Sequence, residues 1–190
     1  GVDPVAMVAH RFLLSALLLA PWALVRPTRG RHLKESLILA VLLFLLYATQ
    51  TIGLGYTSAS NSGFITGLFV IFVPIFLLFF FRKSPTVVQW ISSGLALLGL
   101  WMLTGGISSV NFGDIITLIA AATYAAHLLA TDKYVRADAD AVVLAFHQFW
   151  MTGLMALIFC LLTGRSLAVT GDKAAGTIAF LAVVPTLSAF

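Results

Sequence analysis

Seven apolar stretches, each close to the length of a membrane-spanning helix, restrict the fold of this chain more than any other feature. An α-helix needs about 20 apolar residues to cross the hydrocarbon core of a bilayer. The stretches run over residues 5–25, 36–56, 62–81, 87–103, 113–131, 141–162 and 175–190. Only 9% of the residues are charged, whereas soluble domains carry about 25%. The sequence therefore predicts an all-α, polytopic membrane protein.

The chain also contains an internal repeat. Residues 3–17 (DPVAMVAHRFLLSAL) return 137 positions later, without a gap, as residues 140–154 (DAVVLAFHQFWMTGL). The most informative coincidences involve scarce residue types: Asp3 with Asp140, and His10 with His147. The two copies begin the first and sixth stretches, and an odd difference reverses the direction of the chain through the bilayer. Inverted repeats of this kind are typical of secondary transporters.

The offset of the repeat predicts the size of the intact protein. Subtracting it from the stretch 113–131 places a counterpart before residue 1, and adding it to 62–81 and 87–103 places two helices beyond residue 190. We therefore expect a ten-helix protein built as an inverted repeat of two five-helix bundles, with about seven helices in this chain. The first half, 1–104, would lack its first helix. The second half, 113–190, would be truncated in its third helix, and residues between the halves break the helical pattern.

Positive charge divides the connections between the stretches into two sides. Eight basic residues fall on one side: Arg26, Arg29, Arg31, Lys34, Arg82, Lys83, Lys133 and Arg136. The other side has only Arg165 and Lys173. By the positive-inside rule the eight face the cytoplasm. We expect a multi-pass protein of the plasma membrane, the inner membrane in a bacterium.

Several segments resemble the EamA branch of the drug/metabolite transporter superfamily. They are residues 56–76 (YTSASNSGFITGLFVIFVPIF), residues 94–103 (GLALLGLWML), Gly113-Asp114 with Tyr124-Ala-Ala-His127, and the two helices that begin with Asp. Such families are ten-helix permeases of two inverted halves, so the resemblance implies that helices two to eight are present here. The family often has a Glu shortly after its fourth helix, where this chain reads Arg82-Lys83-Ser84-Pro85. The resemblance therefore implies no role in this chain for the family's Glu.

Polar side chains share one face of the stretch 36–56. Tyr47, Gln50 and Thr51 follow the i, i+3, i+4 spacing of a helix face. Polar groups in hydrocarbon are costly unless they face a cavity or each other, so each is a candidate for function. We predict that these three residues bind substrate. The alternative is that they hydrogen-bond to neighbouring helices and serve only packing.

The segment around residues 58–67 is the second candidate binding element. Ser60, Asn61 and Ser62 can cap a helix start, whose N–H groups favour anionic or carbonyl groups of a solute. We assign three residues of this segment to substrate binding: Asn61, Ser62 and Thr66. Gly63, Gly67 and Pro74 are assigned to gating or to a kink. The two glycines permit another backbone or a ligand to approach closely, and the proline leaves the Val70 carbonyl without its N–H donor. The alternative is a tolerated proline with packing glycines.

The stretch 113–131 contributes the remaining site residues. Tyr124 and His127 lie three positions apart, on one face, and are assigned to substrate binding. His127 can also titrate near neutral pH and couple transport to protons. The alternative is a buried neutral histidine that bonds to a neighbouring helix.

Three more ionisable residues lie within the apolar stretches. His10 and His147 are repeat mates at mirrored depths, which favours a scaffold role for the pair. Arg11 is the only Lys or Arg inside a stretch. We expect it to extend to the outer headgroups or to pair with Asp3, with a gating contact as the alternative.

These features predict a secondary transporter of small organic solutes that exports metabolites or amino-acid-like compounds by alternating access. One alternative is an intramembrane hydrolase using Ser62 with His127 or His147, although Ser62 lacks a G-x-S-x-G pattern. Another is a membrane scaffold subunit that transports nothing. Because the transporter is the preferred function and the hydrolase pattern is missing, we predict no enzymatic activity.

The expected partners are a small-molecule solute and the lipid bilayer. Nucleic acid is not expected, because the basic residues lie in short clusters between apolar stretches. No cofactor or metal is expected, since the four histidines lack metal-ligand spacing. A stripe of small residues at helical spacing, Ser92, Ala96 and Gly99, suits packing within the chain or a homodimer contact.

Overall fold

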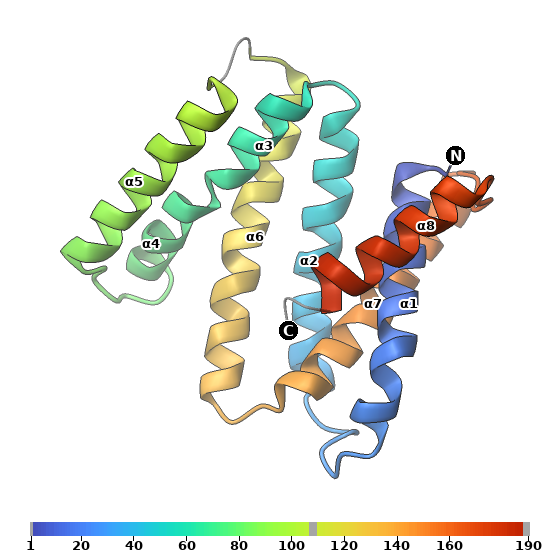
Figure 1. The fold of residues 1–190 in the computed structure, drawn as a ribbon. Coiled ribbons are helices and arrows are strands. Elements are labelled where there is room, and N and C mark those ends of the chain that lie inside the picture. Colours follow the sequence, from blue (N-terminus) through green and yellow to red (C-terminus); the bar gives the residue numbers. More distant parts are fainter. Residues whose placement is uncertain (1, 107–109, 188–190) are drawn as a thin grey trace. The chain divides into compact units, whose positions relative to one another are not determined.

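The computed structural model describes residues 2–106 and 110–187, which fold into helices without any strand (Figure 1). The helices are α1 (Pro4–Leu24), α2 (Leu33–Leu54), α3 (Ala59–Gly67), α4 (Phe69–Phe79), α5 (Val87–Thr104), α6 (Phe112–Arg136), α7 (Ala141–Leu162) and α8 (Asp172–Leu181), followed by the π-helical turn η1 (Ala182–Leu187). Within the described residues, six segments are long and apolar enough to span a membrane, with α3 and α4 counted together. The prediction of an all-α, polytopic membrane protein is confirmed.

Two compact units make up the chain. The terminal unit comprises Gly1–Phe44 and Lys133–Phe190, and the central unit comprises Leu45–Asp132. Helices α2 and α6 contribute to both units. The predicted division into halves at 104–113 is a separate matter, which stays a prediction, and residues 107–109 at that boundary lie outside the described residues.

In the terminal unit, the two copies of the repeat form the paired helices α1 and α7. Asp3 precedes α1, and its carboxylate accepts the N–H groups of the second and third residues after it. Asp140 caps α7 in the same way. Such caps satisfy backbone donors that have no partner within the helix.

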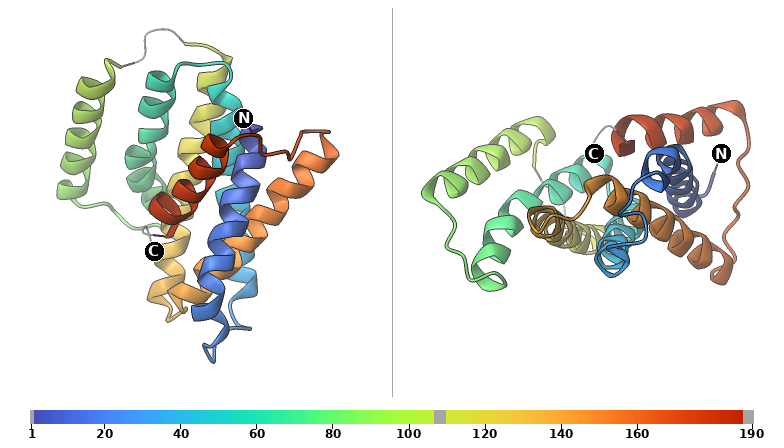
Figure 2. Two further views of the ribbon diagram at one scale, coloured as in Figure 1. Left: turned by 45° about the vertical axis from the view of Figure 1, so that its right-hand side comes forward. Right: turned by 90° about the horizontal axis from the view of Figure 1, so that it is seen from below.

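Each capping carboxylate also contacts the far end of the other helix. Arg165, which follows α7, donates to Asp3 at 3.0 Å. Arg26 and Thr28, which follow α1, both donate to Asp140 at 3.1 Å. Because each contact joins the start of one helix to the end of the other, α1 and α7 run antiparallel (Figures 1 and 2).

These contacts follow the repeat offset. Position 165 is the mate of position 28, and Asp140 is the mate of Asp3, so the pairs Arg165–Asp3 and Thr28–Asp140 exchange when the copies are exchanged. Phe12 contacts its own mate Phe149. A residue that touches its own mate lies beside a local two-fold axis, so the seam between α1 and α7 has approximate two-fold symmetry.

Close packing holds this seam together. A β-carbon added to Gly153 of α7 would lie 2.7 Å from Cγ and 3.0 Å from the backbone N of Leu13 in α1. Thr152, beside it, donates its hydroxyl to the Ala40 carbonyl of α2 at 3.3 Å. Small residues at helix interfaces in membranes allow this approach, since packing rather than hydrophobic burial drives association there.

In the central unit, the stretch predicted as one helix over 62–81 forms α3 and α4. The interruption lies at Leu68, whose N–H donates to the Ile65 carbonyl at 3.1 Å, a bond one residue shorter than the α-helical one. Pro74 lies further along, inside α4. The break therefore follows Gly67 directly rather than lying at the proline.

The start of α6 is held against the end of α2 and the loop after it. A β-carbon on Gly113 would lie 2.5 Å from the Gly53 carbonyl oxygen, so the two backbones are in contact. Asp114, which is buried, accepts the hydroxyl of Thr57 at 2.5 Å and the N–H of Asn111 at 2.9 Å. These contacts fix the position of the start of α6 relative to the end of α2 and the loop after it.

Candidate functional site

All the predicted site residues belong to the central unit. They are Tyr47, Gln50 and Thr51 on α2; Asn61, Ser62, Gly63, Thr66 and Gly67 on α3; Pro74 on α4; and Tyr124 and His127 on α6. The structure therefore gathers residues from four helices into one compact part of the chain. Their roles in binding and gating stay predictions.

A direct contact joins two residues that were predicted from separate stretches. Gln50 of α2 donates its side-chain N–H to the hydroxyl of Thr66 in α3 at 3.2 Å, and both side chains are partly buried. This bond is also what the packing alternative predicts. The bond shows that the Gln50 amide and the Thr66 hydroxyl face each other. A solute that replaced this bond would meet the Gln50 N–H donor beside the Thr66 oxygen acceptor.

An aromatic pair lies at the start of α4. The ring of Phe69 packs on Tyr124 of α6 with 4.4 Å between centroids. Tyr47 of α2 belongs to the same unit as Tyr124. Phe69 was not among the predicted residues, because an aromatic residue in an apolar stretch carries no signal of its own.

His127 lies about one helical turn beyond Tyr124 and is 5% exposed. A histidine at such burial in a membrane-spanning helix can serve either proton transfer or interhelical bonding. Thr131 donates its hydroxyl to the His127 backbone carbonyl at 2.9 Å. Proton coupling through this imidazole stays a prediction.

The predicted capping role of Ser60, Asn61 and Ser62 is wrong. Helix α3 begins earlier, and Ser58 is its N-cap, accepting the Asn61 N–H at 3.1 Å. Asn61 and Ser62 lie inside the helix and are 2% and 3% exposed. The cause is the Ser-Ala-Ser-Asn-Ser run, in which several residues can cap and only tertiary packing selects one.

The residues assigned to gating have different surroundings. A β-carbon on Gly67 would meet the side chain of Leu100 in α5, whereas one on Gly63 would find nothing within 4 Å. Pro74 is buried, and the Val70 carbonyl that it deprives of a donor accepts the hydroxyl of Ser93 in α5 at 2.9 Å. The acceptor predicted to be free is thus satisfied by a neighbouring helix. A serine inside an apolar stretch was the signal for this partner.

Each unit contains a cavity. In the central unit, one of about 220 Å³ separates α4 from α5 and is lined by Val70, Val73, Pro74, Leu77, Val88, Gln89, Ser92 and Ser93. In the terminal unit, one of about 660 Å³ lies between the start of α1 and the start of α8. Among the described residues, no three His, Cys, Asp or Glu side chains are grouped for a metal ion.

Both histidines of the repeat bond to backbone or scaffold groups. Since an indole N–H can only donate, Trp150 fixes Nδ1 of His147 as an acceptor at 3.0 Å, and Nε2–H donates to the Arg29 carbonyl at 2.7 Å. His10 bonds the Ala6 carbonyl of its own helix at 2.7 Å. These contacts fit the scaffold role and occupy both ring nitrogens of His147.

The expected placement of Arg11 is wrong. Its side chain does not extend to the helix end, since the residue is 8% exposed and bonds to Thr186 of η1. Asp3 pairs with Arg165 instead. The spacing along α1 could not reveal a partner 175 residues away.

Known proteins resemble this chain over most of its length. The model of the EamA-like transporter family matches residues 1–105. Two relatives from Archaeoglobus fulgidus, each described as an uncharacterized transporter, are 29% identical over 163 residues and 23% identical over 199 residues. These alignments cover 86% and 100% of this chain but 51% and 68% of the relatives, so the chain spans about half the length of the first. No solved structure matches it significantly.

Proposed function

The chain belongs to the EamA-like transporter family, and we propose that the intact protein is a secondary transporter of small organic solutes. It exports metabolites or amino-acid-like compounds across the plasma membrane. The mechanism is alternating access, in which two inverted halves exchange conformations around one binding region.

The antiparallel pairing of α1 and α7 is the observation that carries this proposal. Two copies of one sequence run in opposite directions, and their end contacts, Arg165–Asp3 and Thr28–Asp140, exchange with the repeat offset. Inverted repeats allow a transporter to present its binding region to either side, because each half can adopt the conformation of the other. A scaffold subunit would have no use for that symmetry.

The polar groups of the central unit support a neutral or zwitterionic solute. The contact between Gln50 and Thr66 and the pair of Phe69 with Tyr124 place an amide, a hydroxyl and aromatic rings among apolar helices. Binding regions for small molecules combine apolar and aromatic lining with a few polar groups that orient the ligand. These residues provide both.

Solute flux in proteoliposomes that contain the intact protein tests the proposal. An amino-acid and metabolite panel is loaded on one side, and wild type is compared with Gln50→Leu and Thr66→Val. Losing one hydrogen bond to a solute costs about 1 kcal/mol, so each variant should lower apparent affinity about threefold to tenfold.

Thr49→Val is the matched control. Its hydroxyl donates to the carbonyls of Leu45 and Leu46 in its own helix, at 2.6 and 3.3 Å. It should transport within about twofold of wild type, since a bond within one helix contributes little to a solute site. If no solute moves although the protein is folded, the transporter proposal is rejected; if all three variants behave alike, the binding assignment is rejected.

A further inference from the structure

Helix α5 is held less closely by protein than the other spans of the described chain. It packs on α3 and α4 but has no buried residue, whereas 17% to 50% of the apolar window is buried in each of the other five candidate spans. Close packing is what drives association of helices in membranes. The cavity of about 220 Å³ between α4 and α5 indicates what else contacts α5.

The cavity is elongated along α4. Its lining on that helix runs from Val70 to Leu77, a rise of about 10 Å. At the Val70 end, Ser93 of α5 bridges the two helices through its hydroxyl, at 2.9 Å from the Val70 carbonyl oxygen. Sites for drug-sized ligands measure about 300–1,000 Å³, so a cavity of this size and shape suits part of a molecule, such as a segment of one acyl chain.

Two polar side chains line the same cavity from the first two turns of α5. The oxygen of the Gln89 amide accepts the Thr86 N–H at 2.8 Å in a capping box, which fixes this side chain. Among the described residues, the N–H groups of the Gln89 amide and the hydroxyl of Ser92 have no hydrogen-bond partner. These donors indicate a ligand that has acceptor oxygens next to its apolar part.

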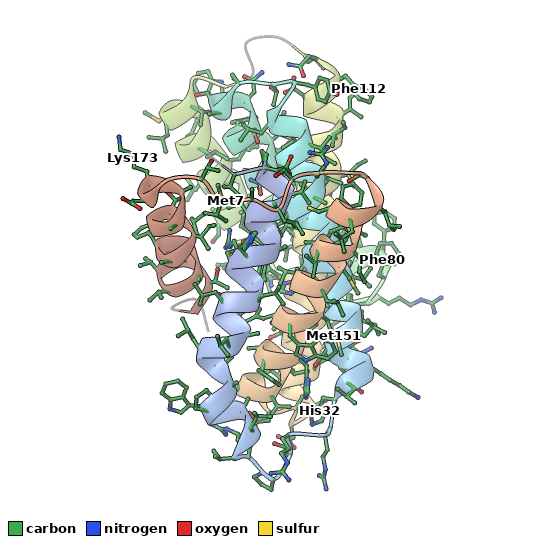
Figure 3. All side chains as sticks on the ribbon, turned by 90° about the vertical axis from the view of Figure 1, so that its right-hand side faces the viewer. Met7, His32, Phe80, Phe112, Met151 and Lys173 are labelled. Carbon is green, nitrogen blue, oxygen red and sulfur yellow. The ribbon has the colours of Figure 1, made fainter. Side chains whose placement is uncertain are left out.

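The connection between α4 and α5 lies at the Leu77 end of the cavity. The N–H of Lys83 donates to the carbonyl of Leu77, a lining residue, at 3.0 Å. Figure 3 labels Phe80, where this connection leaves α4. Arg82 and Lys83 are exposed, and within the described residues neither side chain forms a hydrogen bond or an ion pair. Since positions 36–113 contain no Asp or Glu, two cations stand here without a nearby acid in sequence.

Arg82 has a backbone conformation that side chains rarely adopt. Its φ is 51°, in the left-handed region where a β-carbon comes close to the following carbonyl oxygen. Glycine is the usual residue in this conformation after a helix. Residues held in sparsely populated conformations cluster at binding sites, so a ligand explains this arginine better than the backbone does.

The order of these groups along the helices matches the order of groups in a phospholipid. The cations lie on the connection, the free donors on the first two turns of α5, and the apolar lining deeper. Trp90, 43% exposed between the two donors, is an aromatic residue of the kind that lies at membrane interfaces. The positive-inside rule assigns this connection to the cytoplasmic side, where the leaflet contains anionic lipids.

We propose that one anionic phospholipid binds between α4 and α5 and fastens α5 to the rest of its unit. Its phosphate contacts Arg82 and Lys83, its ester carbonyl oxygens accept hydrogen bonds from Gln89 and Ser92, and a segment of one acyl chain fills the cavity. This inference goes beyond solute transport and does not depend on it. A guanidinium and an ammonium both suit phosphate, and the exposed position keeps them accessible to a headgroup.

Native mass spectrometry of the intact protein tests the proposal. The protein is released from vesicles of equal parts phosphatidylglycerol and phosphatidylcholine with identical acyl chains. Each Lys or Arg near an anionic surface adds about fivefold in affinity, so two should favour one retained phosphatidylglycerol about thirtyfold. Equal retention of both lipids overturns the proposal. So does the absence of bound lipid, the result expected if another helix or a second copy fills the cavity.

A chain-free headgroup separates lipid binding from simple phosphate binding. Glycerol phosphate, added at the concentration of the phosphatidylglycerol, should not displace the retained lipid. Equal competition by this water-soluble probe overturns the proposal, because the cavity would then contribute nothing.

Two variants remove the cations one at a time. Arg82→Gly should lower retention of phosphatidylglycerol about fivefold without harming the fold, because glycine suits the φ of this position. Lys83→Gln should have a similar effect. Lys173→Gln is the control: it removes an exposed cation in the other unit, on the side opposite to Arg82 by the positive-inside rule, and should retain lipid as wild type does.

A third variant changes the cavity donors and keeps the helix cap. Gln89→Glu preserves the oxygen of the capping box, replaces the N–H donors and places a negative charge near the phosphate. Retention should fall at least fivefold, and phosphatidylglycerol, which should raise the melting temperature of the wild type, should not raise that of the variant. Wild-type retention by either Arg82→Gly or Gln89→Glu rejects the site, and each variant decides alone if the other does not fold.

Discussion

Phe12 and Phe149 are repeat mates whose rings contact each other, with 5.6 Å between centroids and both side chains at most 1% exposed. A contact between mates maps onto itself when the two copies are exchanged. In a transporter whose inverted halves exchange conformations, such a contact is therefore the same in both states. The seam between α1 and α7 is expected to stay fixed while other helices move.

A cross-link across this seam should therefore preserve transport. Cysteines replace Phe12 and Phe149 in a Cys160→Ser background, which removes the chain's one natural cysteine. Joined through two disulfides by a short bifunctional methanethiosulfonate reagent, the protein should keep at least half of its flux in proteoliposomes. Loss of flux that a reductant restores would show that the seam moves.

Gly153 should tolerate no larger side chain. A β-carbon there would lie 2.7 Å from Cγ and 3.0 Å from the backbone N of Leu13. A backbone atom, unlike the end of a flexible side chain, cannot move away without shifting its helix. We expect Gly153→Ala to lower the free energy of unfolding by about 1–3 kcal/mol. The measurement is SDS or thermal unfolding of the purified protein.

Gly176 is the matched control for that substitution. It lies inside α8, and an added β-carbon would meet nothing within 4 Å. Gly176→Ala should be neutral or stabilise by up to about 1 kcal/mol, because alanine favours a helix interior. Equal destabilisation by both changes would contradict the packing seen at Leu13.

The contacts of Asp140 should make stability depend on pH. Burial alone would raise the pKa of this carboxyl, which precedes the span of α7, but the Thr28 hydroxyl, two backbone N–H groups and the charge of Arg26 outweigh burial and hold the pKa below its ordinary value. A carboxylate with a lowered pKa stabilises the fold above its unfolded pKa, about 3.9, and this contribution is lost as pH falls through the folded pKa.

Melting temperatures between pH 3 and pH 7 check this expectation. Asp140→Asn should be less stable than wild type at pH 7, and the difference should shrink below about pH 4. Asp138→Asn is the control, since Asp138 is exposed and its positive φ suits asparagine. A difference for Asp140→Asn that stays constant across this range would exclude the charge as its cause.

The hydroxyl of Ser93 should matter only while Pro74 is present. Proline leaves the Val70 carbonyl without its helical N–H donor, and Ser93 donates to that carbonyl at 2.9 Å. Ser93→Ala should therefore cost about 0.6 kcal/mol in the wild type and at most about 1.7 kcal/mol, the mean and the maximum for bonds between membrane helices.

Pro74→Ala restores the missing N–H, so Ser93→Ala should then cost almost nothing. A double-mutant cycle of unfolding free energies measures the coupling. If the two changes are additive, the hydroxyl is not compensating for the proline.

The residues of the candidate site were proposed from the sequence and their roles stay predictions, whereas their contacts came from the structure alone. Polar groups within apolar stretches pointed to Gln50, Thr66 and His127, because hydrocarbon penalises such groups wherever they occur. Their partners were not predictable. The break at Leu68, the cap at Ser58 and the bond between Arg11 and Thr186 each depend on which helix lies alongside, as the contacts show.

The sequence by itself determined the all-helical membrane fold, the repeat and the family. Helix length and apolar composition are local properties, and the bilayer requires backbone groups to be satisfied within each span. Only the tertiary structure decided that Arg11 turns to η1 and that Asp3 pairs with Arg165, 162 residues away. The physical reason is that a side chain forms hydrogen bonds with groups that lie near it in space. The spacing of residues along one helix contains no information about which other helix lies beside it.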